Sequence, residues 1–292
     1  MTRAEPEGPL PLVEVLKRTE AFLRKRGVPS PRLEAELLLA HVLKMERLQL
    51  YLAHDRPVTD VERDALRPLV ARRGGREPLS WILGHRAFHH VELTIEPGVL
   101  DPRPDTETLV EAALGELPAD ATEPVFVADV GCGSGAVGLA IAAARPNVRL
   151  YAIDLDDTAL RVTRTNVARL GLTDRVAVLK GDLLDPVPAA RPIDWVVSNP
   201  PYVPRGEIAA LQPEVSKHEP RLALDGGPDG LDVYRRLIPA AAARARRGVW
   251  LEIGHDQAVR VTDLLRRSGL VDLRCLRDLG NNDRVVGGHI GP

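Results

Sequence analysis

A glycine-rich loop stands between an apolar strand pattern and an apolar helix pattern, in the segment ADVGCGSGAVGLA. Glycines let the backbone pass close beneath a ligand, and the first turn of a helix offers unpaired N–H groups. An acidic residue ends the next strand pattern, where its carboxylate can accept two hydrogen bonds from a ribose diol. This spacing predicts a nucleoside-cofactor site formed by Gly131, Cys132, Gly133, Ser134, Gly135 and Asp154.

The loop alone leaves the identity of that cofactor open. Gly131, Gly133 and Ala136, with an acid about twenty residues later, also satisfy the dinucleotide fingerprint. Nicotinamide dinucleotides and S-adenosylmethionine therefore both remain candidates at this point. Asp182 and Leu183 follow a third strand pattern, RVAVLK, and place another carboxylate at the same rim. That carboxylate suits the exocyclic amine of an adenine, and the alternative role for Asp182 is a helix cap.

The segment DWVVSNPPY places Asn199, Pro200, Pro201 and Tyr202 at the end of a further strand pattern. Two consecutive prolines fix φ and remove two backbone donors, so the loop is stiff and its carbonyls are free to accept. The side-chain oxygen of Asn199 and the carbonyl of Pro200 can accept both protons of a planar NH2 group. The ring of Tyr202 can pack against the face of the same group.

This arrangement suits methyl transfer to an amide or aniline-like nitrogen, whose delocalised lone pair must be recovered for the attack. Hydrogen bonds to both NH2 protons favour the positive charge that develops on nitrogen and hold it in line with the methyl donor. Asn199, Pro200 and Tyr202 are therefore the predicted catalytic residues, and with Pro201 they form the predicted substrate site. A rigid turn is the alternative for these four residues alone, but their position after the glycine loop, Asp154 and Asp182 favours methyl transfer.

Strand and helix patterns alternate from Pro124 to the end of the chain. Such alternation implies right-handed crossovers and a mostly parallel sheet with helices on both faces. Ligands in sheets of this kind bind beyond the carboxyl ends of the strands, which is where the candidate residues fall. The predicted fold class is α/β, with the catalytic domain over residues 103–292.

The chain before this domain has a different pattern. Leu, Val and Ala recur at intervals of three and four residues between turn signals, which predicts a small helical domain over residues 1–82. Ser30 with Pro31 predicts one helix start, and the run from Thr59 to Glu62 predicts another as a capping box.

The pattern turns extended near Phe88, so we expect a β-hairpin linker over residues 83–102. The expected turn of this hairpin is at Pro97 and Gly98. Neighbouring residues of a strand point to opposite faces, so His89 and His90 could not join one ion, and no metal site is expected here although His85 is close in sequence.

Composition excludes several classes of protein. The 292 residues carry Lys+Arg 39 against Asp+Glu 41, a net charge of −2, which removes the long-range attraction to nucleic acid or anionic lipid. Two cysteines exclude a disulfide framework. The start of the chain lacks the pattern of a signal peptide, and no apolar run approaches the length of a membrane span. We therefore expect a cytoplasmic, monomeric enzyme that binds neither membrane nor nucleic acid directly.

These motifs resemble the class I S-adenosylmethionine-dependent methyltransferases, and more closely the release factor glutamine methyltransferases of the HemK/PrmC type. The resemblance covers nearly the whole chain, and the stretch from Glu219 to Leu237 is more family-specific than the glycine loop. The matching segments are REPLSWILG, DPRPDTETLV, ADVGCGSGAVGLA, AIDLDDTAL, VVSNPPYV, EPRLALDGGPDGLDVYRRL, LEIGHDQ and NDRVVGG.

The resemblance implies a five-helix amino-terminal domain that helps to recognise a release factor, and a Rossmann-like catalytic sheet with one antiparallel strand. The catalytic domain would use S-adenosylmethionine to methylate the glutamine of the Gly-Gly-Gln motif in peptide chain release factors. Asp105 stands where the family often has Glu, and Leu183 stands where some members have an aromatic residue beside the adenine. By the same resemblance the target glutamine would lie on residues 199–202, and the cofactor on Gly131 to Gly135, Asp154, Asp182, Leu183 and Asn199.

Five other residues have less certain assignments from sequence. Glu252 and His255 fall near the expected rim, where orienting or capping the next helix is favoured over acid–base catalysis. Cys132 has no evident basic activator, so a redox role is not expected. Arg103 is equally suited to meeting substrate and to stabilising its own loop. Trp195 is expected in the core.

Three other functions are compatible with parts of this pattern. A methyltransferase acting on a glutamine of a large-subunit ribosomal protein would share the NPPY chemistry, and the amino-terminal segment REPLSWILG favours the release factor instead. An adenine-amino methyltransferase of DNA or RNA would need a basic recognition region, against which the net charge argues. A non-catalytic module that binds translation factors would not need an intact NPPY.

Overall fold

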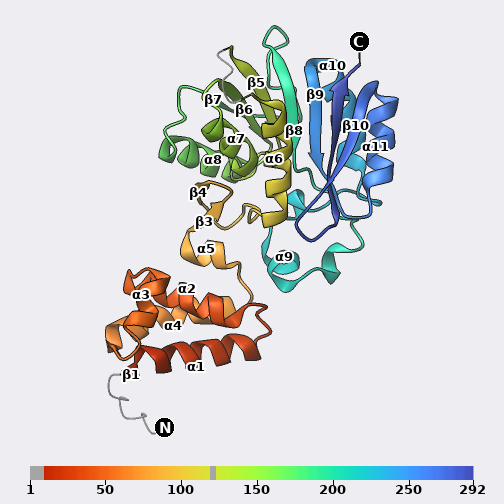
Figure 1. The fold of residues 1–292 in the computed structure, drawn as a ribbon. Coiled ribbons are helices and arrows are strands. Elements are labelled where there is room, and N and C mark those ends of the chain that lie inside the picture. Colours follow the sequence, from red (N-terminus) through yellow and green to blue (C-terminus); the bar gives the residue numbers. More distant parts are fainter. Residues whose placement is uncertain (1–9, 119–122, 292) are drawn as a thin grey trace. The chain divides into compact units, whose positions relative to one another are not determined.

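Two units make up the chain, divided between Gly84 and His85 (Figure 1). The computed structural model describes residues 10–118 and 123–291. Each unit has its own hydrophobic core, built in the first around Leu23 and Leu38 and in the second around Val196 and Leu237. Within the described residues, no helix is both long enough and apolar enough to span a membrane.

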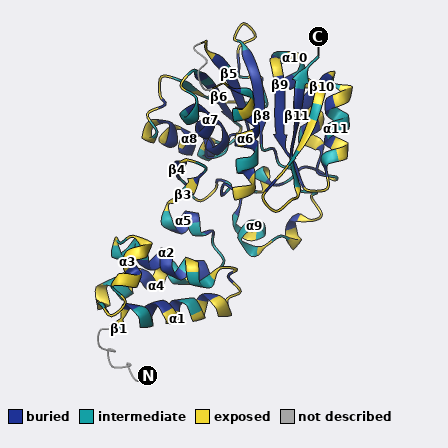
Figure 2. Cartoon of the chain, in the orientation of Figure 1, coloured by how far each residue is buried: buried dark blue, intermediate teal, exposed yellow. Residues whose placement is uncertain are grey.

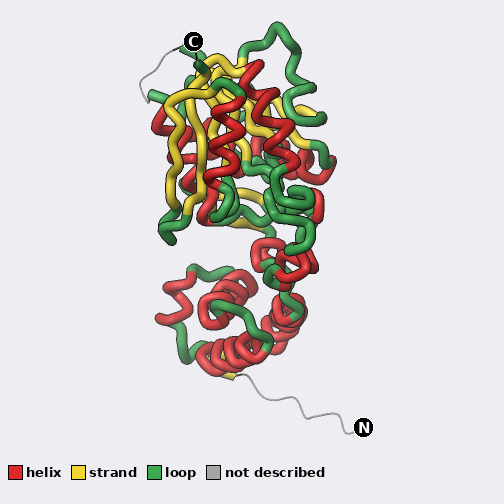
Figure 3. Tube along the Cα trace, turned by 90° about the vertical axis from the view of Figure 1, so that its right-hand side faces the viewer, coloured by secondary structure: helices red, strands yellow, loops and turns green. Residues whose placement is uncertain are grey.

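The first unit consists almost entirely of helices (Figure 3). The capping box expected at Thr59 is confirmed, because Glu62 N–H donates to the Thr59 hydroxyl and Thr59 N–H donates to the Glu62 carboxylate. Ser30 precedes its helix as expected, but its side chain makes no capping bond. The elements are β1 (Leu10–Pro11), α1 (Leu12–Lys25), α2 (Pro31–Leu43), α3 (Arg47–Leu52), β2 (Pro57–Val58), α4 (Asp60–Gly74) and α5 (Leu79–Leu83).

The second unit begins with the expected hairpin, but its turn is not at Pro97 and Gly98. Strands β3 (His85–Phe88) and β4 (Val91–Thr94) pair antiparallel, with Phe88 opposite Val91. The turn therefore consists of His89 and His90, and His89 supplies the positive φ of 51° that so short a connection needs. The two histidines are turn residues, so the alternation of faces expected for a strand does not apply to them.

A seven-stranded sheet forms the centre of this unit, in the order β10-β11-β9-β8-β5-β6-β7. The expected mostly parallel sheet with one antiparallel strand is confirmed, since β11 runs antiparallel to both of its neighbours and the other pairs are parallel. The strands are β5 (Val125–Val130), β6 (Val148–Asp154), β7 (Val176–Lys180), β8 (Ile193–Ser198), β9 (Ala245–Glu252), β10 (Leu270–Arg277) and β11 (Asp283–Ile290).

Helices cover both faces of this sheet, with α6, α7 and α8 on one face and α10 and α11 on the other (Figure 1). The central strands are buried along almost their whole length (Figure 2), which explains their near-continuous apolar sequences. The helical elements are η1 (Pro104–Thr106), α6 (Glu107–Glu116), α7 (Ala136–Ala144), α8 (Asp157–Arg169), η2 (Ile208–Ala210), α9 (Pro213–His218), η3 (Arg221–Ala223), α10 (Asp232–Arg244) and α11 (Ala258–Arg267).

Candidate active site

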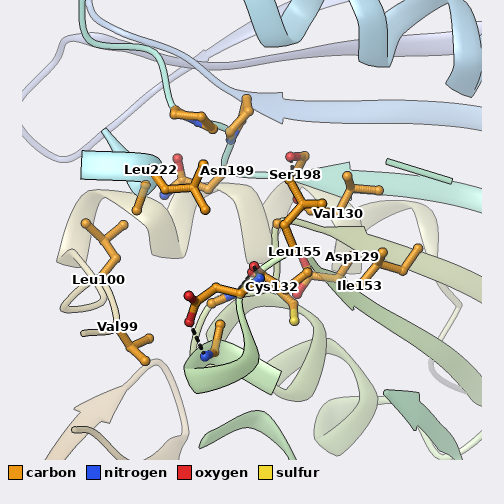
Figure 4. Close-up of a pocket in the computed structure, with 18 of the residues that line it drawn as sticks. Val99, Leu100, Asp129, Val130, Cys132, Ile153, Leu155, Ser198, Asn199 and Leu222 are labelled. Carbon is orange, nitrogen blue, oxygen red and sulfur yellow. Dashed lines mark hydrogen bonds between the residues drawn. The ribbon is translucent and has the colours of Figure 1, made fainter. Parts of the chain in front are cut away.

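A cavity of about 280 Å³ opens at the edge where the parallel strands end. This volume is near the lower end of the range for small-molecule sites, about 300 Å³ and upward. Figure 4 shows Asn199 and Leu222 on one side, opposite Cys132 and Leu155. The structure brings most of the predicted site residues together in its lining: Gly131, Cys132, Gly133, Ser134, Asp154, Asp182, Leu183, Asn199, Pro200 and Pro201.

The glycine loop follows β5 and needs glycine for its backbone conformation. Gly131, Gly133 and Gly135 have φ values of 71°, 57° and 83°, in the region that favours glycine. Gly135 lies directly before α7, and a Cβ there would come within 2.7 Å of Leu139 Cδ1. Gly135 therefore shapes the loop from below and is not among the lining residues.

Most N–H groups of the glycine loop itself are engaged within the protein. Gly131 and Cys132 both donate to the Ile153 carbonyl, and Gly135 donates to the Cys132 carbonyl. Gly133 N–H donates to Asp154 Oδ2 at 2.9 Å. These bonds hold the loop against the neighbouring strand β6. The loop therefore shapes the cavity and leaves few of its own N–H groups to bind a ligand.

Several aspartates lie among the mainly apolar residues that line the cavity. Asp154 is fixed by two backbone N–H groups, because its Oδ1 also accepts from Asp156 at 2.9 Å. Asp182 forms an ion pair with Arg236 of α10, which also lines the cavity. Asp129 is buried at the end of β5, where it accepts from Gly138 N–H of α7 at 2.9 Å. Burial raises the pKa of Asp129 to about 7.

Buried hydrogen bonds hold the NPPY corner, residues 199–202, from two directions. Ser198 Oγ, fully buried at the end of β8, donates to the Val130 carbonyl at 2.6 Å. This bond ties the start of the corner to the start of the glycine loop. Behind the corner, the buried Gln257 amide donates to the Tyr202 carbonyl at 3.0 Å and to the Gly230 carbonyl at 3.2 Å.

The side chains of this corner point in different directions. Asn199 Nδ2 donates to the Thr106 hydroxyl at 3.3 Å, which leaves Asn199 Oδ1 free to accept from a ligand. Tyr202 does not lie against the cavity as the sequence analysis expected. Its hydroxyl donates instead to Glu252 Oε1 at 3.2 Å, at the buried end of β9. Burial raises the pKa of Glu252 to about 7 and also raises the pKa of Tyr202.

The structure gives no catalytic role to three other residues that the sequence singled out. His255 is exposed and does not line the cavity. Burial raises the pKa of the Cys132 thiol, which argues against a reactive thiolate. Trp195 is buried in the sheet as expected. In residues 10–118 and 123–291, no three or more His, Cys, Asp or Glu side chains are arranged so that they could hold a metal ion.

Many lining residues were not predicted from the sequence, and four of them show why. Asp129 directly precedes the glycine loop, and its place at a strand end was an available signal. Thr106, Leu222 and Arg236 lie in the segments DPRPDTETLV and EPRLALDGGPDGLDVYRRL, which carry the family resemblance but no obvious chemical motif. Only the fold brings these segments to the cavity.

Comparison with known proteins matches both units. The family described as "PrmC N-terminal domain" matches residues 14–84, and the one described as "Methyltransferase small domain" matches residues 107–226. A curated "Release factor glutamine methyltransferase" of Geobacter sulfurreducens is 42% identical over 280 residues, covering 95% of this chain and 96% of the relative. The chain belongs to the release factor glutamine methyltransferase family.

A second relative of this name, from Rhodospirillum rubrum, is 44% identical over 284 residues, covering 96% of this chain and 85% of the relative. Among solved structures, the catalytic domain of hMettl16 in complex with the MAT2A 3'UTR hairpin 1 is 17% identical. It covers 77% of this chain and 83% of that one with a TM-score of 0.57, and at this identity it is evidence for the fold alone.

In this family member, Arg103 serves the second of its two expected roles. Its guanidinium binds Glu219 with Nη2 at 2.6 Å from both carboxylate oxygens. The Glu219 side chain is fully buried, at 0% exposure, and Asp101 N–H approaches it at 3.4 Å. The ion pair joins the segment before α6 to the segment before η3, and residues from both segments line the cavity.

We predict that Arg103→Ala lowers the unfolding free energy of the methyltransferase by about 3 kcal/mol or more, because it leaves the Glu219 carboxylate buried without its cation. Urea denaturation followed by tryptophan fluorescence measures this loss. Arg161→Ala, which removes the exposed pair with Glu96, is the matched control and should cost about 1 kcal/mol or less. Equal losses in the two variants would contradict the role assigned to Arg103.

Proposed function

We propose that this protein transfers a methyl group from S-adenosylmethionine to the side-chain amide nitrogen of the glutamine in the Gly-Gly-Gln motif of peptide chain release factors, and so modulates translation termination. The observation that carries the proposal is the orientation of Asn199. Its NH2 group is engaged by Thr106, so its carbonyl oxygen faces the acidic cavity as an acceptor. Membership in the family, shared by relatives named for this activity, supports the same substrate.

The charge of the cavity supports S-adenosylmethionine over a nicotinamide dinucleotide. The acidic residues of the lining are Asp129, Asp154, Asp156, Asp182 and Asp225. The described lining contains one basic side chain, Arg236, which is paired with Asp182. A pyrophosphate would need free N–H groups and positive charge at the start of α7, whereas Asp129 lies there and most of the loop N–H groups are engaged. A sulfonium cation with an ammonium group suits these carboxylates.

Different residues would bind the cofactor and the target amide during methyl transfer. S-adenosylmethionine supplies an electrophilic methyl group when bound. Asp154 would hold the ribose, Asp182 and Leu183 would contact the adenine, and the glycine loop would support the rest of the cofactor. Asn199 Oδ1 and the Pro200 carbonyl would accept both protons of the target amide. These bonds become stronger as positive charge develops on nitrogen, so they lower the barrier.

We predict that Asn199→Ala lowers kcat for release factor methylation by about a hundredfold or more, in line with the loss of one preorganised polar contact. Transfer of a labelled methyl group to purified release factor measures the rate, and circular dichroism checks the fold. Asn281→Ala, in the turn between β10 and β11, is the matched control and should behave as wild type. A turnover unchanged by Asn199→Ala would remove Asn199 from the chemistry.

We predict that Asp154→Ala weakens S-adenosylmethionine binding by about tenfold or more, because it removes the ribose acceptor and the bond that shapes the loop at Gly133. Isothermal titration calorimetry gives the affinity. Asp157→Ala provides the control, since Asp157 is exposed and pairs with Lys180 at 2.6 Å. An affinity that does not change in Asp154→Ala would be incompatible with the assigned site.

We propose that the helical unit, residues 1–84, contributes to recognition of the protein substrate. Deleting it should leave the affinity for S-adenosylmethionine within about threefold, because all residues lining the cavity lie in the second unit. The same deletion should impair methylation of intact release factor. Calorimetry and the methylation assay measure the two effects, and full activity of the truncated enzyme would contradict this role.

The same assay separates the rival substrates. Mass spectrometry after incubation with labelled cofactor can compare a release factor, a large-subunit ribosomal protein and adenine-containing DNA or RNA. The match of residues 14–84 to the PrmC N-terminal domain supports the release factor, and the net charge of −2 supports a protein substrate over nucleic acid. Methylation of the ribosomal protein or nucleic acid in place of the release factor would overturn the proposal.

A further inference from the structure

A buried carboxyl group lies directly behind the NPPY corner, outside the cavity lining. Glu252 ends β9, next to β8 in the sheet, and is 1% exposed. Its Oε1 accepts from the Tyr202 hydroxyl at 3.2 Å. Its Oε2 is also buried and makes no hydrogen bond of good geometry with any residue the structure describes. Buried polar atoms are normally hydrogen-bonded, so Oε2 should have a donor nearby. The identity of that donor indicates the role of Glu252.

The Thr106 hydroxyl is the neighbouring candidate for that donor. It is buried, and it stabilises the charged form of the Glu252 carboxyl. Thr106 Oγ1 accepts from Asn199 Nδ2 at 3.3 Å, so its own proton must be donated to another group. The Glu252 carboxyl group accepts this hydrogen bond most strongly when it is ionised, because both of its oxygens are then acceptors and neither is a donor. Donation from Thr106 to Glu252 would complete a relay, in which Asn199 donates to Thr106 and Thr106 donates to the carboxylate.

The direction of this relay decides which end of the Asn199 amide faces the cavity. With Glu252 ionised, the hydroxyl of Thr106 donates to it and accepts from the Asn199 NH2, and Oδ1 faces the ligand. With Glu252 protonated, the carboxyl can donate to Thr106, which can then donate to Asn199 Oδ1. The Asn199 amide would then turn by about 180° and present its NH2 group to the NH2 group of the target amide. Both groups are donors, so no hydrogen bond could form between them.

We propose that Glu252 is a positioning residue, which acts through Thr106 to keep the Asn199 amide oxygen facing the methyl acceptor and through Tyr202 to hold the NPPY corner in place. This inference rests on the proposed function, since it assigns Asn199 Oδ1 to the target amide. Neither Glu252 nor Tyr202 lines the cavity, so neither is assigned to the catalytic contacts.

The groups that face Glu252 come from four elements. Thr106 and Asp105 lie on η1, Tyr202 follows β8, and Arg284 lies on β11, where it pairs with Asp105 and with Asp278. From α10, the Tyr234 hydroxyl donates to the Glu252 backbone carbonyl at 2.7 Å. Burial raises the pKa of Glu252 to about 7, against the opposing effects of Thr106, Arg284 and Tyr202. The ionised, productive form is therefore favoured as the pH rises through 7.

Kinetics of isosteric variants test the relay. Glu252→Gln and Thr106→Val should each lower kcat for release factor by about tenfold or more. Glu252 does not line the cavity, so Glu252→Gln should leave the Kd for S-adenosylmethionine unchanged within about twofold. Thr106→Ser keeps the hydroxyl and should restore kcat to within about threefold of wild type. At saturating substrates, the rise of kcat through pH 7 in the wild type should be absent in Glu252→Gln. A wild-type kcat in Glu252→Gln, or a Thr106→Ser variant as defective as Thr106→Val, would overturn the proposal.

An NMR measurement tests the relay without any methylation. The side-chain NH2 resonances of Asn199 should shift with a midpoint near pH 7 in the wild type, and this titration should vanish in Glu252→Gln. Glu219→Gln removes another buried carboxyl group and should leave the titration in place. Persistence of the titration in Glu252→Gln would refute the relay, whether or not the release factor is the substrate. A wild-type enzyme that titrates as expected but does not methylate release factor would instead refute the proposed function.

Discussion

Most of the site depends on one constraint: a corner with two prolines, residues 199–202, must be held rigidly beside a loop with three glycines. Parallel strands end at one edge of a sheet, so β5 and β8 bring these two segments together as a consequence of their pairing. The bond from Ser198 Oγ to the Val130 carbonyl then joins the two strand ends directly. Because prolines have no N–H to donate, the corner keeps its carbonyls as acceptors, and the surrounding buried bonds fix where those acceptors point.

The cavity is also acidic. Carboxylates from successive strand ends gather around it, and the nearest basic side chain is already paired. Burial makes two of these carboxylates costly to ionise, as the raised pKa values of Asp129 and Asp154 show, and a cation bound beside them would offset that cost. A cationic methyl donor suits the aspartates of the cavity, and a neutral amide as methyl acceptor suits the NPPY corner. The aspartates therefore make the cavity electrostatically less favourable for an anionic cofactor than for a cationic one.

The sequence was most informative where function depends on local backbone geometry. The alternation of strands and helices, the positive-φ glycines and the paired prolines are local signals, and they located the sheet, the loop and the corner. Side-chain partners distant in sequence carry no such signal. The contacts of Arg103 with Glu219 and of Thr106 with Asn199 join segments about a hundred residues apart, so only the fold reveals them. Tyr202 shows the same limit, because its motif indicates an aromatic ring near the substrate while packing turns that ring toward Glu252.

The engaged N–H groups of the glycine loop and the position of the hairpin turn have a related cause. A glycine-rich loop before a helix resembles an anion site, but strand β6 and Asp154 engage most of its donors. In the hairpin, Pro97 and Gly98 are the stronger turn signal, yet strand pairing places the turn at His89 and His90. In both cases hydrogen bonds to a neighbouring strand decide the local structure, and a short stretch of sequence does not show those bonds.

The most direct test of the account is a crystal structure of the enzyme with S-adenosylhomocysteine and a peptide containing Gly-Gly-Gln. The account predicts the adenosyl group among the carboxylates of the cavity, and the glutamine Nε2 within hydrogen-bond distance of both Asn199 Oδ1 and the Pro200 carbonyl, facing the sulfur atom. A glutamine bound elsewhere, or with its nitrogen turned away from these two oxygens, would contradict it.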